Sequence, residues 1–388
     1  MKTYREINER IEKGEAVVMT AEEVIGLVES QGVKEAAKEV DVVTTGTFGA
    51  MCSSGAFLNF GHSEPPIKMQ KVWLNGVPAY TGMAAVDAYI GATELKEEDN
   101  MHYGGAHVIE DLISGEVLTL RATSYGTDCY PRREIETSIT LDMMNQAYLF
   151  NPRNAYQNYA VATNSTDRIL FTYMSKLLPN YGNATFSNAG QLSPLMNDPT
   201  CRTIGIGTRI FLGGGVGYVS WEGTQFSTTA PVKNGVPTRP SRSIAVIGDL
   251  KKMNTEYIRA LTLHGYGISL AVGLGVPIPI LDEEMMKSVA IRDEDIFAPV
   301  FDYSVQSRSR KVLKEVSYAE LRSGHIELFG KDVKTSSLSS YYKARQIANE
   351  LKKSIEKGTF LLSEPVQPLP SEESTKPLEI RSKEGVKI

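Results

Sequence analysis

One segment carries much of the structural information in this sequence: Val40-Asp41-Val42-Val43-Thr44-Thr45-Gly46. Its β-branched side chains favour a strand, and Gly46 ends that strand. The chain continues as Thr47-Phe48-Gly49-Ala50-Met51-Cys52-Ser53-Ser54-Gly55, whose small residues predict a loop holding Cys52. A helix beginning at Ser53 or Ser54 would direct its amide groups at this thiol and favour the thiolate.

Two short helices are predicted before this strand. Thr20-Ala21-Glu22-Glu23 matches a capping box, in which the Thr20 hydroxyl and the Glu23 carboxylate each accept a hydrogen bond from the other residue's amide. Val33 to Glu39 is predicted as the second helix. The succession of helix, helix and strand indicates a mixed α/β fold, with α+β allowed, and leaves the sheet topology open.

Downstream of the loop, Asn75-Gly76 predicts a type I′ hairpin, and Pro78 places the following strand at a sheet edge. Further predicted elements are a β-rich segment at 202–226, a strand at 244–249 and helices at 254–264 and 339–357, the last ending at Gly358. We therefore expect one large domain over residues 1–363. Residues 364–388 contain little to bury and are expected to form a disordered tail.

Composition narrows the class of protein. The 388 residues include 41% hydrophobic and 22% charged residues, with a formal net charge of −5. This balance is typical of a folded soluble protein, and it lacks the basic excess of a nucleic-acid-binding surface. The most apolar window, 268–281, is shorter than the roughly 20 residues a membrane span needs. With no targeting segment at the N-terminus, a cytoplasmic location is expected.

Three cysteines are the candidate chemical groups, at positions 52, 129 and 201. They form no Cys-x-x-Cys pair, so any joint site must be assembled by the fold. Cys129 lies in Ser124-Tyr125-Gly126-Thr127-Asp128-Cys129-Tyr130-Pro131-Arg132-Arg133, where Arg132 and Arg133 could hold an anion. Cys201 is expected to be structural. From composition alone, Cys52 and Cys129 could equally be buried fillers, as free cysteines often are.

Glycines and histidines supply weaker candidates. A glycine cluster at 205–217 lacks the spacing of a nucleotide-binding loop, but the amides of Gly214 and Gly215 could cradle a carboxylate or a sulfur anion. His102 and His107 are candidate general acids or bases, or ordinary surface histidines. No His-Glu-x-x-His metal motif and no Gly-x-Ser-x-Gly elbow occurs. No metal site is expected from these patterns.

The segments 44–55 and 123–132, together with Phe211-Leu212-Gly213-Gly214-Gly215-Val216-Gly217-Tyr218, resemble the homocysteine biosynthesis family. These are the L-aspartate semialdehyde sulfurtransferases of methanogens and anaerobic bacteria. The resemblance covers about residues 1–363. It implies an enzyme of homocysteine and methionine biosynthesis, with Cys52 and Cys129 in the sulfur chemistry, and a separate ferredoxin-like electron donor.

The implied reaction converts the aldehyde of aspartate semialdehyde into the thiol of homocysteine, using sulfide or a persulfide donor. One of Cys52 and Cys129 would carry a persulfide sulfur and the other would resolve the intermediate, in an order that stays open. Arg132 or Arg133 would bind the substrate carboxylate, and His107 or His102 would protonate the departing oxygen.

Two other interpretations remain open. Cys52, Cys129 and Cys201 could ligate a [4Fe–4S] cluster whose fourth iron holds hydrosulfide, a cofactor that the sequence does not establish. Alternatively, the chain could be a non-catalytic protein that binds or senses a small ligand, with inert cysteines. A homo-oligomer is allowed by either interpretation.

Overall fold

The computed structural model describes residues 1–98 and 101–380. Its centre is a nine-stranded sheet in which every pairing is antiparallel. The strand order is β21-β22-β16-β17-β20-β10-β4-β7, with β3 paired to β22. Its strands are β3 (Thr47–Ala50), β4 (Gly55–Asn59), β7 (Asp87–Gly91), β10 (Gln146–Asn154), β16 (Arg209–Leu212), β17 (Gly215–Glu222), β20 (Ile244–Asp249), β21 (Ile258–Leu263) and β22 (Gly267–Gly275).

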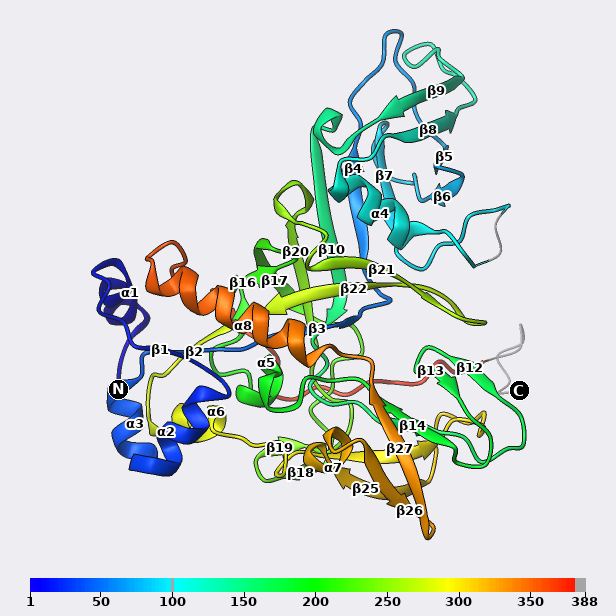
Figure 1. Ribbon diagram of the computed structural model, residues 1–388. Helices are drawn as coiled ribbons and strands as arrows, with labels where there is room; N and C mark the ends of the chain where they lie inside the picture. Colours follow the sequence, from blue (N-terminus) through cyan, green and yellow to red (C-terminus); the bar gives the residue numbers. More distant parts are fainter. Residues whose placement is uncertain (99–100, 381–388) are drawn as a thin grey trace.

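A second, six-stranded sheet contains both parallel and antiparallel pairs, in the order β25-β24-β11-β14-β27-β26. Figure 1 shows it below the central sheet. Its strands are β11 (Val161–Thr163), β14 (Asn183–Phe186), β24 (Phe297–Asp302), β25 (Val312–Ser317), β26 (His325–Leu328) and β27 (Lys331–Ser337).

An upper lobe carries a four-stranded sheet in the order β6-β5-β8-β9 (Figure 1). Its strands are β5 (Lys71–Leu74), β6 (Val77–Ala79), β8 (Leu118–Thr123) and β9 (Glu134–Ile139). Asn75 and Gly76 join β5 to β6 with φ values of 50° and 82°. Both residues have the left-handed backbone conformation, so the predicted type I′ hairpin is confirmed. The strand that holds Pro78, β6, lies at the edge of this sheet, as predicted.

The remaining strands form short sheets: β1 (Val18–Thr20), β2 (Val42–Thr44) and β23 (Pro277–Pro279) in one, and the pairs β12 (Leu170–Thr172) with β13 (Ser175–Leu177), β15 (Gly205–Ile206) with β28 (Gln367–Pro368), and β18 (Val232–Lys233) with β19 (Val236–Pro237). The helices are α1 (Tyr4–Glu12), α2 (Glu23–Gln31), α3 (Val33–Glu39), α4 (Gly105–Ser114), α5 (Pro194–Asn197), α6 (Glu283–Val289), α7 (Tyr318–Arg322) and α8 (Tyr341–Glu356), with 3-10 turns η1 (Leu141–Met143), η2 (Gly190–Leu192) and η3 (Leu250–Lys252).

Helix α8 packs directly on the segment 44–50, which leads to Cys52. The buried residues of α8 recur at steps of three and four and turn toward β3 and β22: Ala344, Ile347, Ala348, Leu351 and Ile355. The Thr44 hydroxyl donates to the backbone oxygen of Ala348 at 2.9 Å. A Cβ at Gly46 would overlap the carbonyl oxygen of Ala344. Glycine therefore allows the helix and the strand to make backbone contact here.

The predicted mixed α/β class is confirmed, as are the helix at 33–39, the strand at 244–249 and the late helix. The Thr20 capping box is also present, because the Glu23 carboxylate accepts from the Thr20 amide at 2.7 Å and the Thr20 hydroxyl from the Glu23 amide at 3.2 Å. The predicted helix over 254–264 is wrong. Residues Ile258 to Leu263 instead form β21, because six consecutive residues pair with the buried strand β22.

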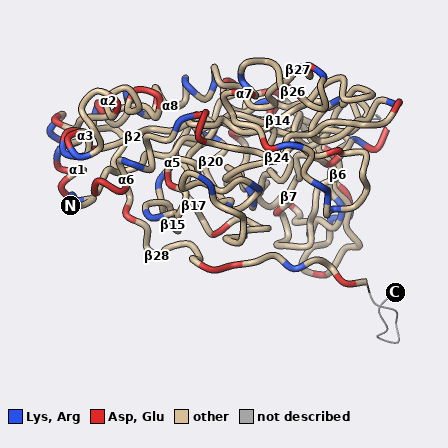
Figure 2. Tube along the Cα trace, turned by 90° about the horizontal axis from the view of Figure 1, so that it is seen from below, with Lys and Arg blue, Asp and Glu red and all other residues tan. Residues whose placement is uncertain are grey.

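The C-terminal segment makes specific contacts as far as Glu373, within the predicted tail. Strand β28 pairs with β15, and the backbone and hydroxyl of Thr228 bond to Glu373. Figure 2 shows this segment running along one face of the molecule beyond β28, with acidic and basic residues of the chain interspersed. Pairing to a distant strand supplies the order that local composition does not. The rest of the predicted tail, 381–388, lies outside the described residues.

No helix within residues 1–98 and 101–380 has both the length and the apolar character needed to cross a membrane.

Candidate functional site

Cys52 lies in the turn between β3 and β4, at the middle of the molecule. Strand β3 pairs with β22 up to Ala50 opposite Ala271, and the Met51 amide continues the ladder to the Leu270 oxygen at 2.7 Å. The chain then turns, and β4 begins at Gly55. The suggested helix start at Ser53 or Ser54 is therefore wrong, because these residues turn into a strand. Cys52 is exposed.

Buried hydrogen bonds tie this turn to the end of β10. The Ser53 hydroxyl donates to Asn151 Oδ1 at 2.8 Å and to the Arg153 carbonyl oxygen at 3.1 Å. The Asn151 amide donates to Ser54 Oγ at 2.9 Å, and Asn151 is 0% exposed. Both residues that follow Cys52 are thus fixed to a central strand.

A cavity of about 980 Å³ opens beside this turn. Cys52 lines it, together with Arg153 and Tyr156 from the end of β10 and Tyr266 and Ser269 from the β21–β22 hairpin and β22. The loop of 225–240, which contains the small β18–β19 hairpin, and the segment 187–193 complete much of its wall. The thiol therefore faces a space large enough for a small metabolite.

The charged side chains that line this cavity are all positive among the described residues. Among its described lining residues, the charged ones are Arg153, Arg239 and Arg308, and none is Asp, Glu, Lys or His. The chain as a whole carries a net charge of −5, so the cavity is a local concentration of positive charge in an acidic protein. Such a site attracts anions.

Arg153 is held in position within the cavity. Its Nε donates to Thr224 Oγ1 at 3.1 Å and its Nη1 to the Tyr156 hydroxyl oxygen at 3.0 Å. Burial is the largest cause of a raised pKa at Tyr156, with the thiolate of Cys52 adding to it and Arg153 opposing it. The Tyr156 hydroxyl therefore stays protonated at neutral pH and can donate a hydrogen bond.

Further tyrosines extend from the cavity toward the six-stranded sheet. The Tyr159 hydroxyl donates to that of Tyr173 at 3.2 Å, and the Tyr173 and Tyr303 hydroxyls lie 3.1 Å apart. Burial raises the pKa of Tyr159 and of Tyr303. This side of the cavity is consequently lined by neutral hydroxyl groups.

Ser269 has a buried hydroxyl with no hydrogen-bond partner among the described residues. The residue is 1% exposed and lines the cavity from β22. Strand β3 pairs with β22 as far as Ala50 opposite Ala271, so the Cys52 turn begins close to the part of β22 that holds Ser269. An unpaired buried hydroxyl is costly, so Ser269 Oγ has the capacity for one further hydrogen bond at the cavity wall.

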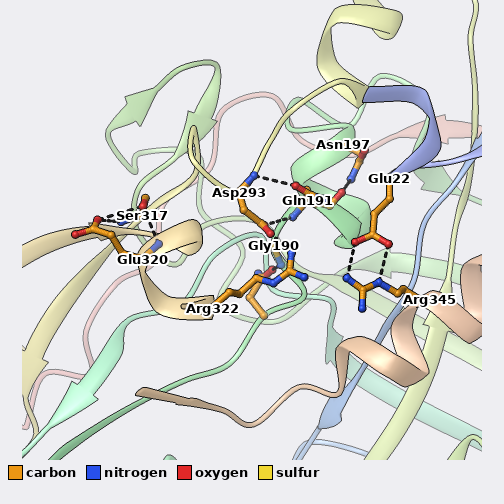
Figure 3. Close-up of polar contacts among 10 residues, drawn as sticks. Glu22, Gly190, Gln191, Asn197, Asp293, Ser317, Glu320, Arg322 and Arg345 are labelled. Carbon is orange, nitrogen blue, oxygen red and sulfur yellow. Dashed lines mark hydrogen bonds and ion pairs between the residues drawn. The ribbon is translucent and has the colours of Figure 1, made fainter. Parts of the chain in front are cut away.

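A buried polar network fixes the segment 187–193 of the cavity wall, as Figure 3 shows. Asp293 accepts from the Gln191 amide at 2.8 Å, while its own amide donates to the Gln191 side chain at 3.0 Å. Arg322 forms an ion pair with Asp293. Burial raises the pKa of Asp293, and Arg322 opposes that shift. In the same view Arg345 of α8 makes a two-bond ion pair with Glu22.

Cys129 occupies a different part of the molecule. It is exposed in the loop between β8 and β9, with Thr127 Oγ1 at 3.5 Å from its sulfur, and it does not line the cavity. Arg132 fastens this loop to the Glu64 and Pro65 carbonyl oxygens, which follow the far end of β4. Strand β4 and the segment after it therefore lie between Cys52 and the attachment point of the Cys129 loop.

The other predicted binding groups also lie outside the cavity. Arg132 and Arg133 belong to the Cys129 loop, and two donors of Arg132 are used by its own chain. Gly214 and Gly215 line a second cavity of about 540 Å³, which also contains Glu256. A Cβ at Gly214 would overlap the Asn254 amide, so these glycines permit close packing at the β16–β17 turn.

The two candidate histidines are not among the described residues that line the Cys52 cavity. His102 is exposed in the loop before α4. His107 lies on α4 with its ring stacked on Tyr103, at 5.2 Å between ring centroids. Burial lowers the pKa of His107, with Glu110 and Asp111 opposing the shift.

A cluster ligated by all three cysteines does not fit this arrangement. Cys201 is 7% exposed within the main hydrophobic core, where burial raises the pKa of its thiol. Cys52 and Cys129 are separated by β4, as above. Within residues 1–98 and 101–380, no group of three or more cysteine, histidine or acidic residues is arranged to hold a metal ion. We derive no chemical step through such a cluster.

Sequence interpretation missed Asn151, Arg153, Tyr156 and Ser269. The first three lie in one polar run, Asn151-Pro152-Arg153-Asn154-Ala155-Tyr156-Gln157-Asn158-Tyr159, which follows the strand pattern of β10. Polar residues at the end of a buried strand were the available signal. Ser269 gave no signal, because only the fold brings β22 and the Cys52 turn to the same cavity.

Comparison with known proteins assigns the family. The family described as "Homocysteine biosynthesis enzyme, sulfur-incorporation" matches residues 16–362. An L-aspartate semialdehyde sulfurtransferase of Methanosarcina acetivorans is 58% identical over 375 residues, covering 97% of this chain and 73% of the relative. A second, of Methanocaldococcus jannaschii, is 55% identical over 384 residues, covering 95% and 73%. No solved structure matches. The chain therefore belongs to the family of homocysteine biosynthesis enzymes that incorporate sulfur.

Proposed function

We propose that this enzyme incorporates sulfur into L-aspartate semialdehyde to give L-homocysteine, with Cys52 acting in the arginine-lined cavity. The observation that carries the proposal is an exposed thiol beside a cavity whose described charged groups are all arginines. The names of the two relatives at 58% and 55% identity support the choice of substrate. A cytoplasmic location suits three free cysteines.

The overall chemistry fixes what the site must supply. Aldehyde, hydrogen sulfide, two electrons and two protons give the thiol and one water. When a persulfide on Cys52 is the sulfur source, its terminal sulfur adds to the aldehyde carbon, giving a disulfide-linked hemithioacetal. This route requires a persulfide donor, because sulfide forms a persulfide only with a two-electron oxidant. Two electrons from a second thiol or an external reductant then cleave the S–S bond and release the hemithioacetal. Loss of water and two more electrons give the thiol, so this route takes four electrons in total.

The lining of the cavity favours direct attack by sulfur on the aldehyde. A lysine imine would be the alternative way to activate the aldehyde, and no lysine is among the described lining residues. The departing oxygen needs a proton, and Tyr156 offers a hydroxyl whose pKa is raised by burial. Tyr156 replaces His102 and His107 in this role because both histidines lie elsewhere.

Cys129 is assigned to the second thiol function. Direct disulfide exchange requires Cα atoms within about 7 Å, and β4 lies between Cys129 and Cys52 of one chain. We propose that Cys129 of a second copy takes part in the exchange in a homo-oligomer, since Cys129 is exposed. A separate ferredoxin-like protein would deliver the electrons, as the exposed position of Cys129 allows.

Anaerobically purified enzyme tests the proposal. It is incubated with L-aspartate semialdehyde, sulfide and a reductant, and homocysteine is measured by mass spectrometry, with iron determined in the same sample. Homocysteine formation by iron-free protein supports the thiol chemistry. Activity that follows the iron content would transfer the role to a cluster. Intermolecular Cys52–Cys129 disulfides, sought by peptide mapping after mild oxidation, test the exchange between copies.

A further inference from the structure

We infer that the Cys52 cavity selects its aldehyde by a carboxylate group and makes little use of the amino group. This inference rests on the proposed function and extends it to the basis of substrate choice. Arg153 is assigned as the carboxylate anchor, and the hydroxyl of Ser269 as the partner of the aldehyde oxygen next to Cys52.

The charge pattern gives the first argument. A substrate ammonium group is normally bound by a carboxylate, and the described lining contains no Asp or Glu. Arg153, Arg239 and Arg308 instead provide three guanidinium groups in the same space. The cavity can therefore neutralise a carboxylate, whereas an ammonium group meets neutral oxygens only.

The geometry of Arg153 gives the second argument. A guanidinium group has five N–H donors, and the bonds to Thr224 and Tyr156 use two of them. No ion pair joins Arg153 to an acidic residue in the described part of the chain. The remaining donors can hold a carboxylate bidentately, in an orientation that the two protein bonds fix in advance. Arg239 and Arg308 are exposed and would attract the anion toward the cavity.

The unpaired hydroxyl of Ser269 gives the third argument. Its Oγ is buried without a partner among the described residues, and Ser269 lines the same cavity as Cys52. An aldehyde oxygen placed there would receive a hydrogen bond while its carbon faces the sulfur. Carboxylate at Arg153 and aldehyde at Ser269 and Cys52 together define a short carboxylated aldehyde as the ligand class.

Four aldehydes separate these contributions: L-aspartate semialdehyde, 4-oxobutanoate without the amino group, 3-aminopropanal without the carboxylate, and butanal without either. We expect kcat/KM for 4-oxobutanoate within about tenfold of that for aspartate semialdehyde. We expect a loss of about 100-fold for the two aldehydes without a carboxylate, from the size of a lost charged hydrogen-bond pair. Equal or better use of 3-aminopropanal than of 4-oxobutanoate would overturn the inference.

The variant Arg153→Met should remove the preference for 4-oxobutanoate over butanal, whereas a merely structural role would lower both rates together. Arg5→Met is the matched control, because Arg5 is exposed on α1 and pairs with Glu9. An unchanged preference in Arg153→Met would contradict the assignment.

A binding readout keeps this test separate from the proposed function. Iodoacetamide labelling of Cys52 is followed by peptide mass spectrometry, with Cys129 in the same sample as the reference outside the cavity. Carboxylate recognition predicts that 4-oxobutanoate protects Cys52 from labelling and butanal does not. It also predicts that the protection by 4-oxobutanoate disappears in Arg153→Met. These results support the inference even if no homocysteine forms. Equal protection of Cys52 by both aldehydes would contradict carboxylate recognition. Absence of turnover with selective protection would refute the proposed function alone.

Discussion

Ser53 donates a 2.8 Å hydrogen bond to the buried side chain of Asn151, so the residue after Cys52 is fixed to the end of β10. The same strand end supplies Arg153 and Tyr156 to the cavity. The Asn151 side chain thus fixes the position of the Cys52 turn relative to Arg153 and Tyr156. The site depends on this link between two segments about 100 residues apart in the chain.

Asn151→Ala should lower kcat while leaving the protein folded. Loss of the bonds to Ser53 and Ser54 should cost about 1–3 kcal/mol of unfolding free energy and free the Cys52 turn. The measurement is kcat together with the alkylation rates of Cys52 and Cys129. Asn158→Ala is the control, since Asn158 is equally buried and bonds to Pro237 and Phe297. Equal loss of kcat in both variants would show a general stability effect.

Tyr156→Phe should reduce kcat by about 100-fold with little change in the KM for the semialdehyde, because it removes a proton donor from the departing oxygen. Tyr148→Phe, on the exposed side of β10, serves as the control and should keep the wild-type rate. Steady-state kinetics of both variants check this. A wild-type kcat in Tyr156→Phe would remove the tyrosine from the mechanism.

His107→Phe should keep homocysteine formation and change the pH dependence of stability. Burial lowers the pKa of His107 from 6.5, so the unfolded chain binds the proton more readily than the folded one. Stability is therefore lost as pH falls below about 6.5, and the variant should lose less. Urea unfolding at pH 7.5 and 5.5 measures this. An equal drop in both proteins would exclude His107 as the cause.

Gly46→Ala should destabilise the protein by about 1–3 kcal/mol or more, because a Cβ there meets the backbone of α8 at Ala344. Gly26→Ala is the matched control: Gly26 lies within α2, a Cβ would have open space, and helix propensity predicts a gain of about 0.5–1 kcal/mol. Thermal unfolding of the two variants should shift in opposite directions. A neutral Gly46→Ala would contradict the close packing of α8.

Local interactions explain which parts of the fold were predictable. The Thr20 capping box and the Asn75-Gly76 hairpin depend on neighbouring residues, so their patterns are complete in the sequence. Strand β21 was mistaken for a helix because its conformation comes from pairing with β22. The order of the segment around Glu373 likewise depends on bonds to a distant residue, Thr228.

The candidate site was predictable only in part, for the same reason. Cys52 could be selected from its loop and from family resemblance, since both are written in consecutive residues. Arg132 and Arg133 were chosen because they stand near Cys129 in sequence, whereas the cavity receives Arg153, Arg239 and Arg308 from other segments. The polar run at 151–159 contains Arg153, but the consecutive residues do not show that this run lies at the Cys52 cavity.

The most direct test of the account replaces Cys52 by alanine and measures homocysteine formed from L-aspartate semialdehyde, sulfide and reductant under anaerobic conditions. Cys201→Ala is the control, because that thiol is buried in the core and does not line the cavity. We expect Cys52→Ala to fall to the rate without enzyme and Cys201→Ala to keep most of the wild-type rate. Wild-type activity in Cys52→Ala would contradict the assignment of the cavity as the place where sulfur reaches the aldehyde.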